Sequence, residues 1–332
     1  MSIQLQVPAG APHARILGIG AYRPSRIIPN ADLIEAIDSS DEWIQQRSGI
    51  KQRRWADEHE TVQSMSVAAS RIALERSGIE PAQVDAVVVA TVSHMFQTPA
   101  IATAIAHELG TDRPAAFDIS AACAGFCHAL AVASDMVRAG SAKHVLVIGV
   151  ERLTDITSLN DRGTAFIFAD GAGAAVVGPS DEPGIGPVVW GSDGEQFDLI
   201  RQKEDWRDVL KMEKPSMPHL VMQGNPVFRW AAFEMAKVAQ LTLDRTGVSV
   251  DDLDLFVPHQ ANMRINQLVA GKLGVPESKV VHNIQRYGNT TAATIPIGLS
   301  ESFAEGKLAE GTTVLMAAFG SGYTWGAAVA RF

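Results

Sequence analysis

The chain has 332 residues, of which 46% are hydrophobic and 20% charged, with a formal net charge of −9 and only two cysteines. This much apolar material excludes a disordered chain, and the length suits two domain-sized halves or one large α/β unit. The negative charge argues against general nucleic-acid binding, while the lack of a membrane-length apolar run and of a signal-peptide pattern in residues 1–10 leads us to expect a cytoplasmic protein without a membrane partner.

Apolar strands and amphipathic helices alternate along the first part of the chain. The predicted order is helix 61–77, strand 84–91, helix 99–109, strand 116–120, helix 123–139 and strand 144–150. This alternation is typical of mostly parallel sheets that are covered by helices on both faces. Residues 180–226 break the rhythm, and we expect there the opening strand of a second unit followed by a loop excursion.

The pattern then repeats. Two pairs of similar segments lie 169 residues apart: 73–89 with 242–257, and 145–149 with 314–318. Short apolar strands can match by chance, but two matches in register favour a duplicated α/β unit. We therefore expect an N-terminal half (1–180) that carries a cysteine nucleophile and a C-terminal half (181–332) that carries a histidine and an asparagine. Ligands should collect beyond the carboxyl ends of the strands, near the join.

Cys123 stands where a short apolar strand gives way to small residues and then to the predicted helix 123–139. A thiol at a helix start meets unpaired backbone N–H groups and the positive end of the helix dipole, and both favour the thiolate. The position suits a nucleophile, although an inert small hydrophobe is an equally good interpretation of this segment alone. The second cysteine, Cys127, adds too few ligands for a zinc site.

His259 and Asn289 are the candidate partners of this cysteine. Pro258 tends to end a strand, which leaves His259 at the strand's carboxyl end, and Asn289 follows a predicted strand near 279–284. Taken alone, the histidine suits a surface or core position and the asparagine an ordinary turn. Position 292 lies 169 residues after Cys123, so a pseudo-twofold axis would bring the cysteine turn and the asparagine turn face to face.

With their surroundings, these three residues resemble β-ketoacyl-acyl-carrier-protein synthase III, the thiolase-fold condensing enzyme that starts fatty-acid chains. The resemblance runs from about Ile16 to Phe332. Motifs in the same order carry it: residues 41–50, 117–126, 161–164, 168–174, 259–262, 288–290 and 319–326. It implies an α/β fold of duplicated αβαβα layers with two mostly parallel central sheets, an acyltransferase activity and a homodimer.

The resemblance implies a reaction in two stages, without cofactor or metal. Cys123 takes an acyl group from acyl-CoA, and malonyl-acyl-carrier protein then loses CO2 and attacks that group in a decarboxylative Claisen condensation. His259 and Asn289 donate hydrogen bonds to the enolate, and the backbone N–H groups of Cys123 and Ser321 stabilise the tetrahedral oxyanion. Ser321 departs from the three-glycine run usual in the family, which requires a negative φ there or strain absorbed elsewhere.

The family also implies substrate contacts. Trp43 and Arg47, four apart on one helical face, match the pair that holds the adenine end of CoA, although the same spacing suits an exposed helix surface. Arg162 matches a second adenine or phosphate contact. The remaining matches are substrate contacts at Gly224, Phe228, Asn262 and Phe319, and a docking patch for the acidic carrier protein at Arg264 and Lys272. For Lys272 a merely solvated helix face is an equal alternative.

Thr98 falls where the partner subunit is expected to cap the acyl pocket. Its loop is longer than in acetyl-selective members, and threonine is smaller than an aromatic ring. We therefore expect primers larger than acetyl.

Other reactions on the same fold stay open. The alternative is a polyketide starter-unit ketosynthase or another acyltransferase. A non-decarboxylating thiolase would need a second catalytic cysteine, and no cysteine follows Cys127. A non-catalytic partner subunit would have lost the nucleophile, whereas Cys123, His259 and Asn289 are all present.

Overall fold

The computed structural model describes residues 5–6 and 8–332, so part of residues 1–10, on which the signal-peptide expectation rests, lies outside the described residues. Two sheets dominate. The first has the order β1-β7-β6-β4-β5, with β1 (His13–Tyr22), β7 (Asp170–Ser180), β6 (Val145–Arg152), β4 (Ala86–Ala90) and β5 (Ala115–Ile119). The second has the order β11-β12-β13-β8, with β11 (Leu255–Pro258), β12 (Thr313–Phe319), β13 (Trp325–Arg331) and β8 (Val189–Gly191).

One strand in each sheet runs against the others. β5, β4 and β6 are parallel, and β7 is antiparallel to both β6 and β1. In the second sheet β11 and β12 are parallel, and β13 is antiparallel to both β12 and β8. The expectation of two mostly parallel sheets is confirmed, with β7 and β13 as the exceptions.

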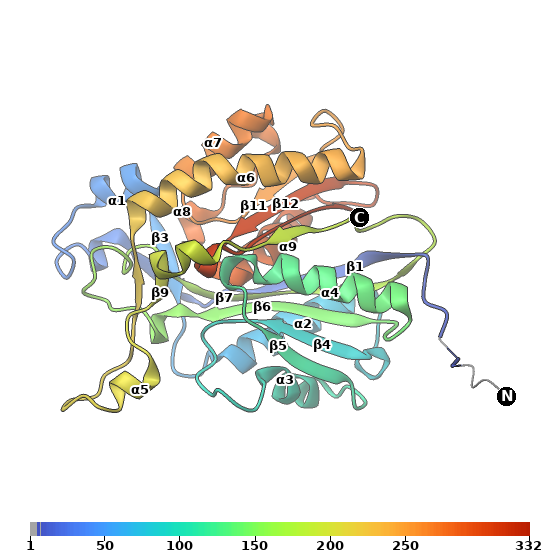
Figure 1. Ribbon diagram of the computed structural model, residues 1–332, viewed down its shortest axis with the longest axis horizontal. Helices are drawn as coiled ribbons and strands as arrows, with labels where there is room; N and C mark the ends of the chain where they lie inside the picture. Colours follow the sequence, from blue (N-terminus) through green and yellow to red (C-terminus); the bar gives the residue numbers. More distant parts are fainter. Residues whose placement is uncertain (1–4, 7) are drawn as a thin grey trace.

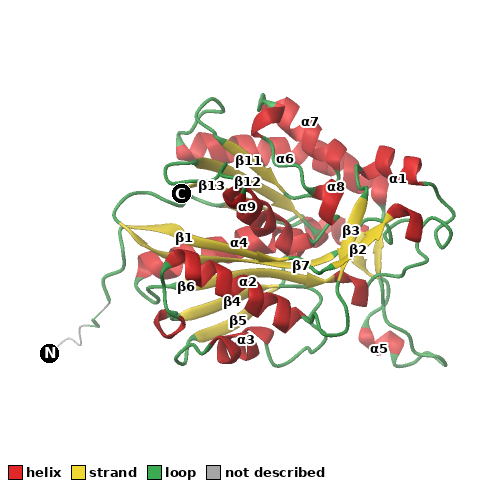
Figure 2. Ribbon diagram, turned by 180° about the vertical axis from the view of Figure 1, so that it is seen from behind, coloured by secondary structure: helices red, strands yellow, loops and turns green. Residues whose placement is uncertain are grey.

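Six helices complete a layered arrangement: α2 (Val62–Ser77), α3 (Ile101–Leu109), α4 (Gly125–Ala139), α6 (Gly224–Thr246), α7 (Met263–Leu273) and α9 (Thr294–Ala304). α2 and α3 cover the outer face of the first sheet, and α6 and α7 cover that of the second (Figures 1 and 2). α4 and α9 lie between the two sheets. This is the duplicated αβαβα layering that the resemblance implies.

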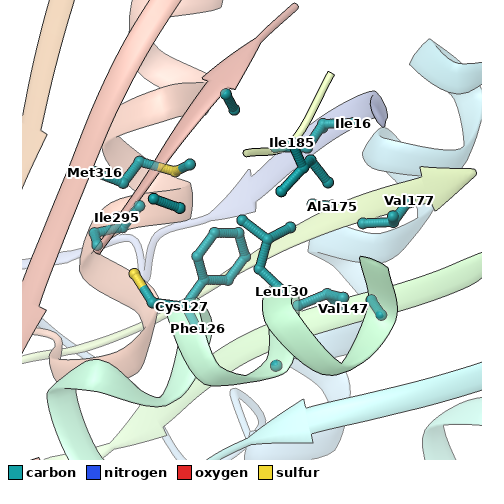
Figure 3. Close-up of a cluster of buried hydrophobic side chains, with 14 of the residues drawn as sticks. Ile16, Phe126, Cys127, Leu130, Val147, Ala175, Val177, Ile185, Ile295 and Met316 are labelled. Carbon is teal, nitrogen blue, oxygen red and sulfur yellow. The ribbon is translucent and has the colours of Figure 1, made fainter. Parts of the chain in front are cut away.

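The middle layer exists because each sheet alternates its side chains between two cores. Along β6, Val145 and Val147 pack into the core shared with α4, α9 and the second sheet, whereas Leu146 and Ile148 pack against α2 and α3. In the shared core, Phe126 of α4 lies among side chains from both sheets (Figure 3). The turns at the N-terminal ends of α4 and α9 are therefore held from both sides.

The 169-residue repeat has a structural counterpart in two short turns. Ala122–Ala124 forms a single 3₁₀ turn before α4, and Thr291–Ala293 forms one before α9. Ala122 and Thr291, at equivalent positions, both have left-handed φ, at 45° and 50°. Gly149 of β6 allows the two turns to pack on the same strand end, because a Cβ there would lie 2.2 Å from the Ala292 carbonyl oxygen. The division at residue 180 stays a prediction.

The smaller elements are β2 (Arg26–Pro29), α1 (Asp41–Ser48), β3 (Gln52–Trp55), β9 (Ile200–Gln202), α5 (Trp206–Val209), β10 (Leu220–Met222) and α8 (Ile284–Tyr287). α5 lies at the tip of the excursion that follows β8 (Figure 1). Among the described residues, no helix combines the length and the apolar character needed to span a bilayer.

The predicted strand at 279–284 is wrong. Only Val280 bridges to β11, at Phe256, and α8 begins at Ile284. Gln260 explains the change, because its Oε1 accepts hydrogen bonds from the backbone N–H groups of Asn283 and Ile284, at 3.2 Å each. Those N–H groups are satisfied by a side chain instead of a neighbouring strand, so the segment turns into a helix.

Candidate active site

Cys123, His259 and Asn289 line one cavity of about 510 Å³. They come from three places that are distant in sequence: the turn before α4, the carboxyl end of β11 and the turn before α9. The convergence that the resemblance implied is therefore present. Each residue reaches the cavity for a different structural reason.

Cys123 lies in the 3₁₀ turn that precedes α4, with its neighbour Ala122 in the left-handed region. Burial raises the pKa of its thiol, the Glu151 carboxylate adds to the rise, and the Cys123 amide and Thr291 side chain oppose it. The expected stabilisation of the thiolate is thus wrong for the free site, because loss of water around sulfur outweighs the helix start. The cysteine rests as a neutral thiol.

His259 follows β11 and continues its ladder, with its backbone N–H donating to the Ala317 carbonyl at 2.8 Å. The edge of its ring meets Phe319, with ring centres 6.2 Å apart and an interplanar angle of 80°. Burial lowers its pKa to about 3, so the imidazole is neutral at physiological pH. Its Nδ1 is buried without a hydrogen-bond partner among the described residues.

Asn289 is fixed at both ends of its turn. Its backbone N–H donates to Ile167 and its carbonyl accepts from Ala169, each at 2.9 Å. Its side-chain Oδ1 accepts from the Thr291 backbone N–H, also at 2.9 Å. Because the oxygen is engaged, the amide presents its Nδ2 donor to the cavity.

The Ser321 turn approaches the cysteine closely. A Cβ added to Gly320 would lie 2.5 Å from the Cys123 backbone nitrogen, so the two segments are in direct contact. The left-handed φ values of this turn fall on Gly322 and Tyr323, at 68° and 46°, and not on Ser321. The serine is therefore accommodated without left-handed strain, and its hydroxyl donates a hydrogen bond to the Ile200 carbonyl.

An aromatic and cationic cluster lines the same cavity. The guanidinium carbon of Arg162 lies 5.1 Å from the centre of the Trp43 ring, and that of Arg47 lies 5.7 Å from it. Phe166 packs edge-on against the same indole at 5.2 Å. Such a half-buried indole flanked by two guanidinium groups suits a flat, anionic ligand.

The other expected substrate contacts also line the cavity, namely Gly224, Phe228, Asn262 and Phe319. Asn262 connects two walls, because its Nδ2 donates to the Arg47 carbonyl at 2.9 Å while its Oδ1 caps α7. Arg264 joins them, with its guanidinium carbon 5.0 Å from the Phe228 ring centre. The sequence reasoning missed several residues of the wall: Phe166, Ile167, Ile200, Met222, Asn225, Val227 and Ile265.

Two expected residues lie elsewhere. Thr98 is exposed and is not part of the cavity wall. Lys272 lines a separate groove between α6 and α7, with its Nζ 3.7 Å from the Phe233 ring centre. Their assigned roles, capping across a subunit boundary and docking a carrier protein, stay predictions.

Gln260 is a structural residue that the sequence did not single out. Its Nε2 donates to the carbonyls of Pro258 and Val281, at 2.9 and 2.8 Å, in addition to the two bonds its oxygen accepts. It thereby ties the end of β11, which carries His259, to the segment that leads to Asn289. Only its place directly after the histidine hinted at this.

The nucleophile lies in the turn before α4, within the helix layer that the two sheets share. The equivalent turn from the other half faces it. This arrangement defines a thiolase-fold condensing enzyme. The family described as 3-oxoacyl-[acyl-carrier-protein] synthase III matches residues 117–194, and its C-terminal family matches residues 243–332. The chain belongs to the β-ketoacyl-acyl-carrier-protein synthase III family, condensing acyl-transferring enzymes of fatty-acid biosynthesis.

Curated relatives agree over almost the whole chain. A β-ketoacyl-acyl-carrier-protein synthase III of Streptomyces glaucescens is 53% identical over 96% of each chain, and one from Streptomyces coelicolor is 54% identical over the same shares. Among solved structures, the priming β-ketosynthase of the R1128 polyketide pathway has a TM-score of 0.96 at 46% identity, covering 99% of this chain and 98% of that one. The Aquifex aeolicus synthase III has 0.90 at 38%, covering 96% and 100%.

Proposed function

We propose that this protein loads an acyl primer from acyl-CoA onto Cys123 and condenses it with malonyl-acyl-carrier protein, releasing CO2 and a β-ketoacyl-carrier protein. The observation that carries the proposal is a cavity lined by Cys123, His259 and Asn289. The same cavity is lined by the Trp43 cluster, which consists of Trp43, Arg47, Arg162 and Phe166. Both stages use only side-chain and backbone groups of the protein, so no cofactor is assigned.

The first stage is acyl transfer. The sulfur of Cys123 attacks the thioester carbonyl, the carbon–sulfur bond to CoA breaks, and the thiol proton ends on the departing CoA sulfur. The tetrahedral oxyanion forms beside the Cys123 and Ser321 backbone N–H groups, which the close approach of Gly320 brings together. A preformed donor of this kind contributes on the order of 3 kcal/mol to lowering the barrier.

The second stage makes a carbanion. The carbon–carboxyl bond of the malonyl group breaks, its electrons form an enolate, and CO2 leaves. A neutral imidazole and the Asn289 Nδ2 can each donate a hydrogen bond to the enolate oxygen, which requires donors and no strong base. The enolate carbon then attacks the acyl thioester, the carbon–sulfur bond to Cys123 breaks, and the released thiolate takes up a proton from water.

The Trp43 cluster is assigned to the adenine and phosphate end of CoA. Replacement Trp43→Ala should raise KM for acyl-CoA roughly tenfold, because a stacked base contributes about 1–3 kcal/mol. The maximal rate should change little, since this contact is equal in ground and transition states. Steady-state kinetics with varied acyl-CoA measures both constants. Trp206→Ala, which removes an exposed indole on α5 away from the cavity, is the matched control, and equal KM values for the two variants would contradict the assignment.

The partner assignments follow from surface chemistry and family. Arg264 and Lys272, both on α7, are assigned to docking of the acidic carrier protein. Thr98 is assigned to a homodimer in which its exposed loop reaches the partner's acyl pocket, and the protein is assigned to the cytoplasm. Met95 and Phe96, exposed on the same loop at 44% and 71%, support an interface there.

Primers larger than acetyl are the preferred substrates in this proposal. A polyketide starter role is the second candidate, favoured by the similarity to the R1128 priming ketosynthase. Competition among acyl-CoA primers for mass labelling of Cys123, followed by a chase with malonyl-acyl-carrier protein, tests the function. We expect label discharge coupled to CO2 release; label that stays on the cysteine would overturn the condensation, and better loading of acetyl than of four-carbon primers would overturn the primer assignment.

A further inference from the structure

Glu151 is a buried carboxyl group that the condensation leaves unused. It is 0% exposed and lies near the carboxyl end of β6. By the alternation of the strand it shares a face with Val147 and Gly149, the face that packs on the turns before α4 and α9. Its side chain therefore points toward the layer that holds Cys123.

The carboxyl group also holds the segment that follows β4. Its Oε2 accepts from the Ser93 hydroxyl at 2.6 Å, the Val92 N–H at 3.1 Å and the Thr91 hydroxyl at 3.3 Å. Among the described residues, its Oε1 has only a 3.3 Å contact, to the same Val92 N–H. One oxygen is saturated with donors and the other is available to carry a proton.

Burial and these donors act in opposite directions on its charge. Burial raises the pKa of Glu151 to about 8 and the donors oppose the rise, so the group is mostly neutral at pH 7. When it ionises above that pH, its charge raises the pKa of Cys123. Like charges disfavour each other, most strongly where burial reduces screening by water.

The Cys127 thiol of α4 lies in the same shared core, and burial raises its pKa. The charged groups near this strand face elsewhere. Arg152 and Asp170 are register partners of β6 and β7, one position along from Glu151 and hence on the opposite face, and the Arg152 guanidinium forms an ion pair with Asp155 at 3.5 Å. α4 also carries His128, which bonds to the Trp325 carbonyl, and the exposed Asp135–Arg138 pair.

We propose that Glu151 is a positioning residue: its neutral carboxyl anchors the segment Thr91–Ser93 that follows β4, and its ionised form suppresses the Cys123 thiolate. The anchored segment is also the base of the loop that carries Thr98. The proposal rests on the proposed condensation, in which Cys123 is the nucleophile. Its direct test needs neither acyl-CoA nor carrier protein.

Glu151→Gln mimics the neutral acid, because the amide oxygen can take the three donors of Oε2 and the amide nitrogen replaces the protonated oxygen. Alkylation of Cys123 by iodoacetamide, followed by intact mass from pH 6 to 10, reads out the thiolate. In the natural protein the rate should rise with pH and flatten above about pH 8, where Glu151 ionises. In the variant the flattening should disappear, with a rate at pH 9 about three- to tenfold higher.

Two further variants separate charge from structure. Ser93→Ala keeps the carboxyl but removes a donor that lowers its pKa, so the flattening should move to higher pH. Asp170→Asn removes a similarly buried carboxyl from β7 and should leave the profile unchanged. Superimposable profiles for the natural protein, Glu151→Gln and Ser93→Ala would overturn the proposal. A changed profile in a protein that fails to condense would overturn the proposed function alone.

Discussion

Replacing Cys123 by alanine should lower the condensation rate by at least about 10⁴-fold, because no other group in the cavity can form the acyl thioester. Acyl loading, measured by intact mass after incubation with acyl-CoA, should fall to background. CO2 release from malonyl-acyl-carrier protein should continue, since His259 and Asn289 remain in place to stabilise the enolate.

Cys127→Ala is the matched control, because this second thiol, on α4, is fully buried in the core and lies outside the cavity wall. It should keep loading and condensation near the natural rate, with a lower melting temperature from the lost packing. Loading that survives in Cys123→Ala and fails in Cys127→Ala would reverse the assignment of the nucleophile.

His259→Ala and Asn289→Ala should have the opposite effect to Cys123→Ala: acyl loading is kept and CO2 release is lost. Each removes one donor to the enolate, so CO2 release should fall by about 10²–10³-fold, while acyl loading of Cys123 should persist. Radiolabelled malonyl-acyl-carrier protein measures CO2 release, which belongs to the second stage, and intact mass measures acyl loading separately. Burial lowers the pKa of His259 to about 3, so its protonation should cause no loss of decarboxylation between pH 5 and 7.

A double replacement tests whether the two donors act on one oxygen. If they do, His259→Ala combined with Asn289→Ala should cost clearly less than the product of the single effects. Gln223→Ala, a change outside the cavity wall at the N-cap of α6, serves as a polar-to-alanine control. Loss of loading and of CO2 release in equal measure would indicate that these side chains maintain the fold of the site instead.

The repeating strands and helices were readable because burial leaves a periodic pattern in the sequence. Helices 61–77 and 123–139 were placed within a few residues of α2 and α4. The strand at 279–284 failed because its backbone donors are taken by Gln260, a contact between residues about twenty positions apart. Apolar content alone cannot reveal that a side chain replaces a neighbouring strand as the hydrogen-bond acceptor.

The positions of the candidate site residues were predictable, whereas their charge states were not. A cysteine before a helix suggests a thiol pKa lowered by the helix dipole. The burial of Cys123 and its closeness to Glu151, which both raise that pKa, depend on how the sheet and the turns pack together. Glu151 itself looks in the sequence like the polar end of an apolar strand. Only the alternation of β6 within the folded sheet turns its side chain toward the layer that holds Cys123.

The left-handed backbones of Ala122 and Thr291 set a limit on engineering for heat resistance. Side chains in this region cost of order 1 kcal/mol or more, so glycine at either position would relieve the backbone. The same change would widen the conformational range of a turn that carries a reacting group. A higher melting temperature gained by substitution at either position would therefore come with a lower turnover rate.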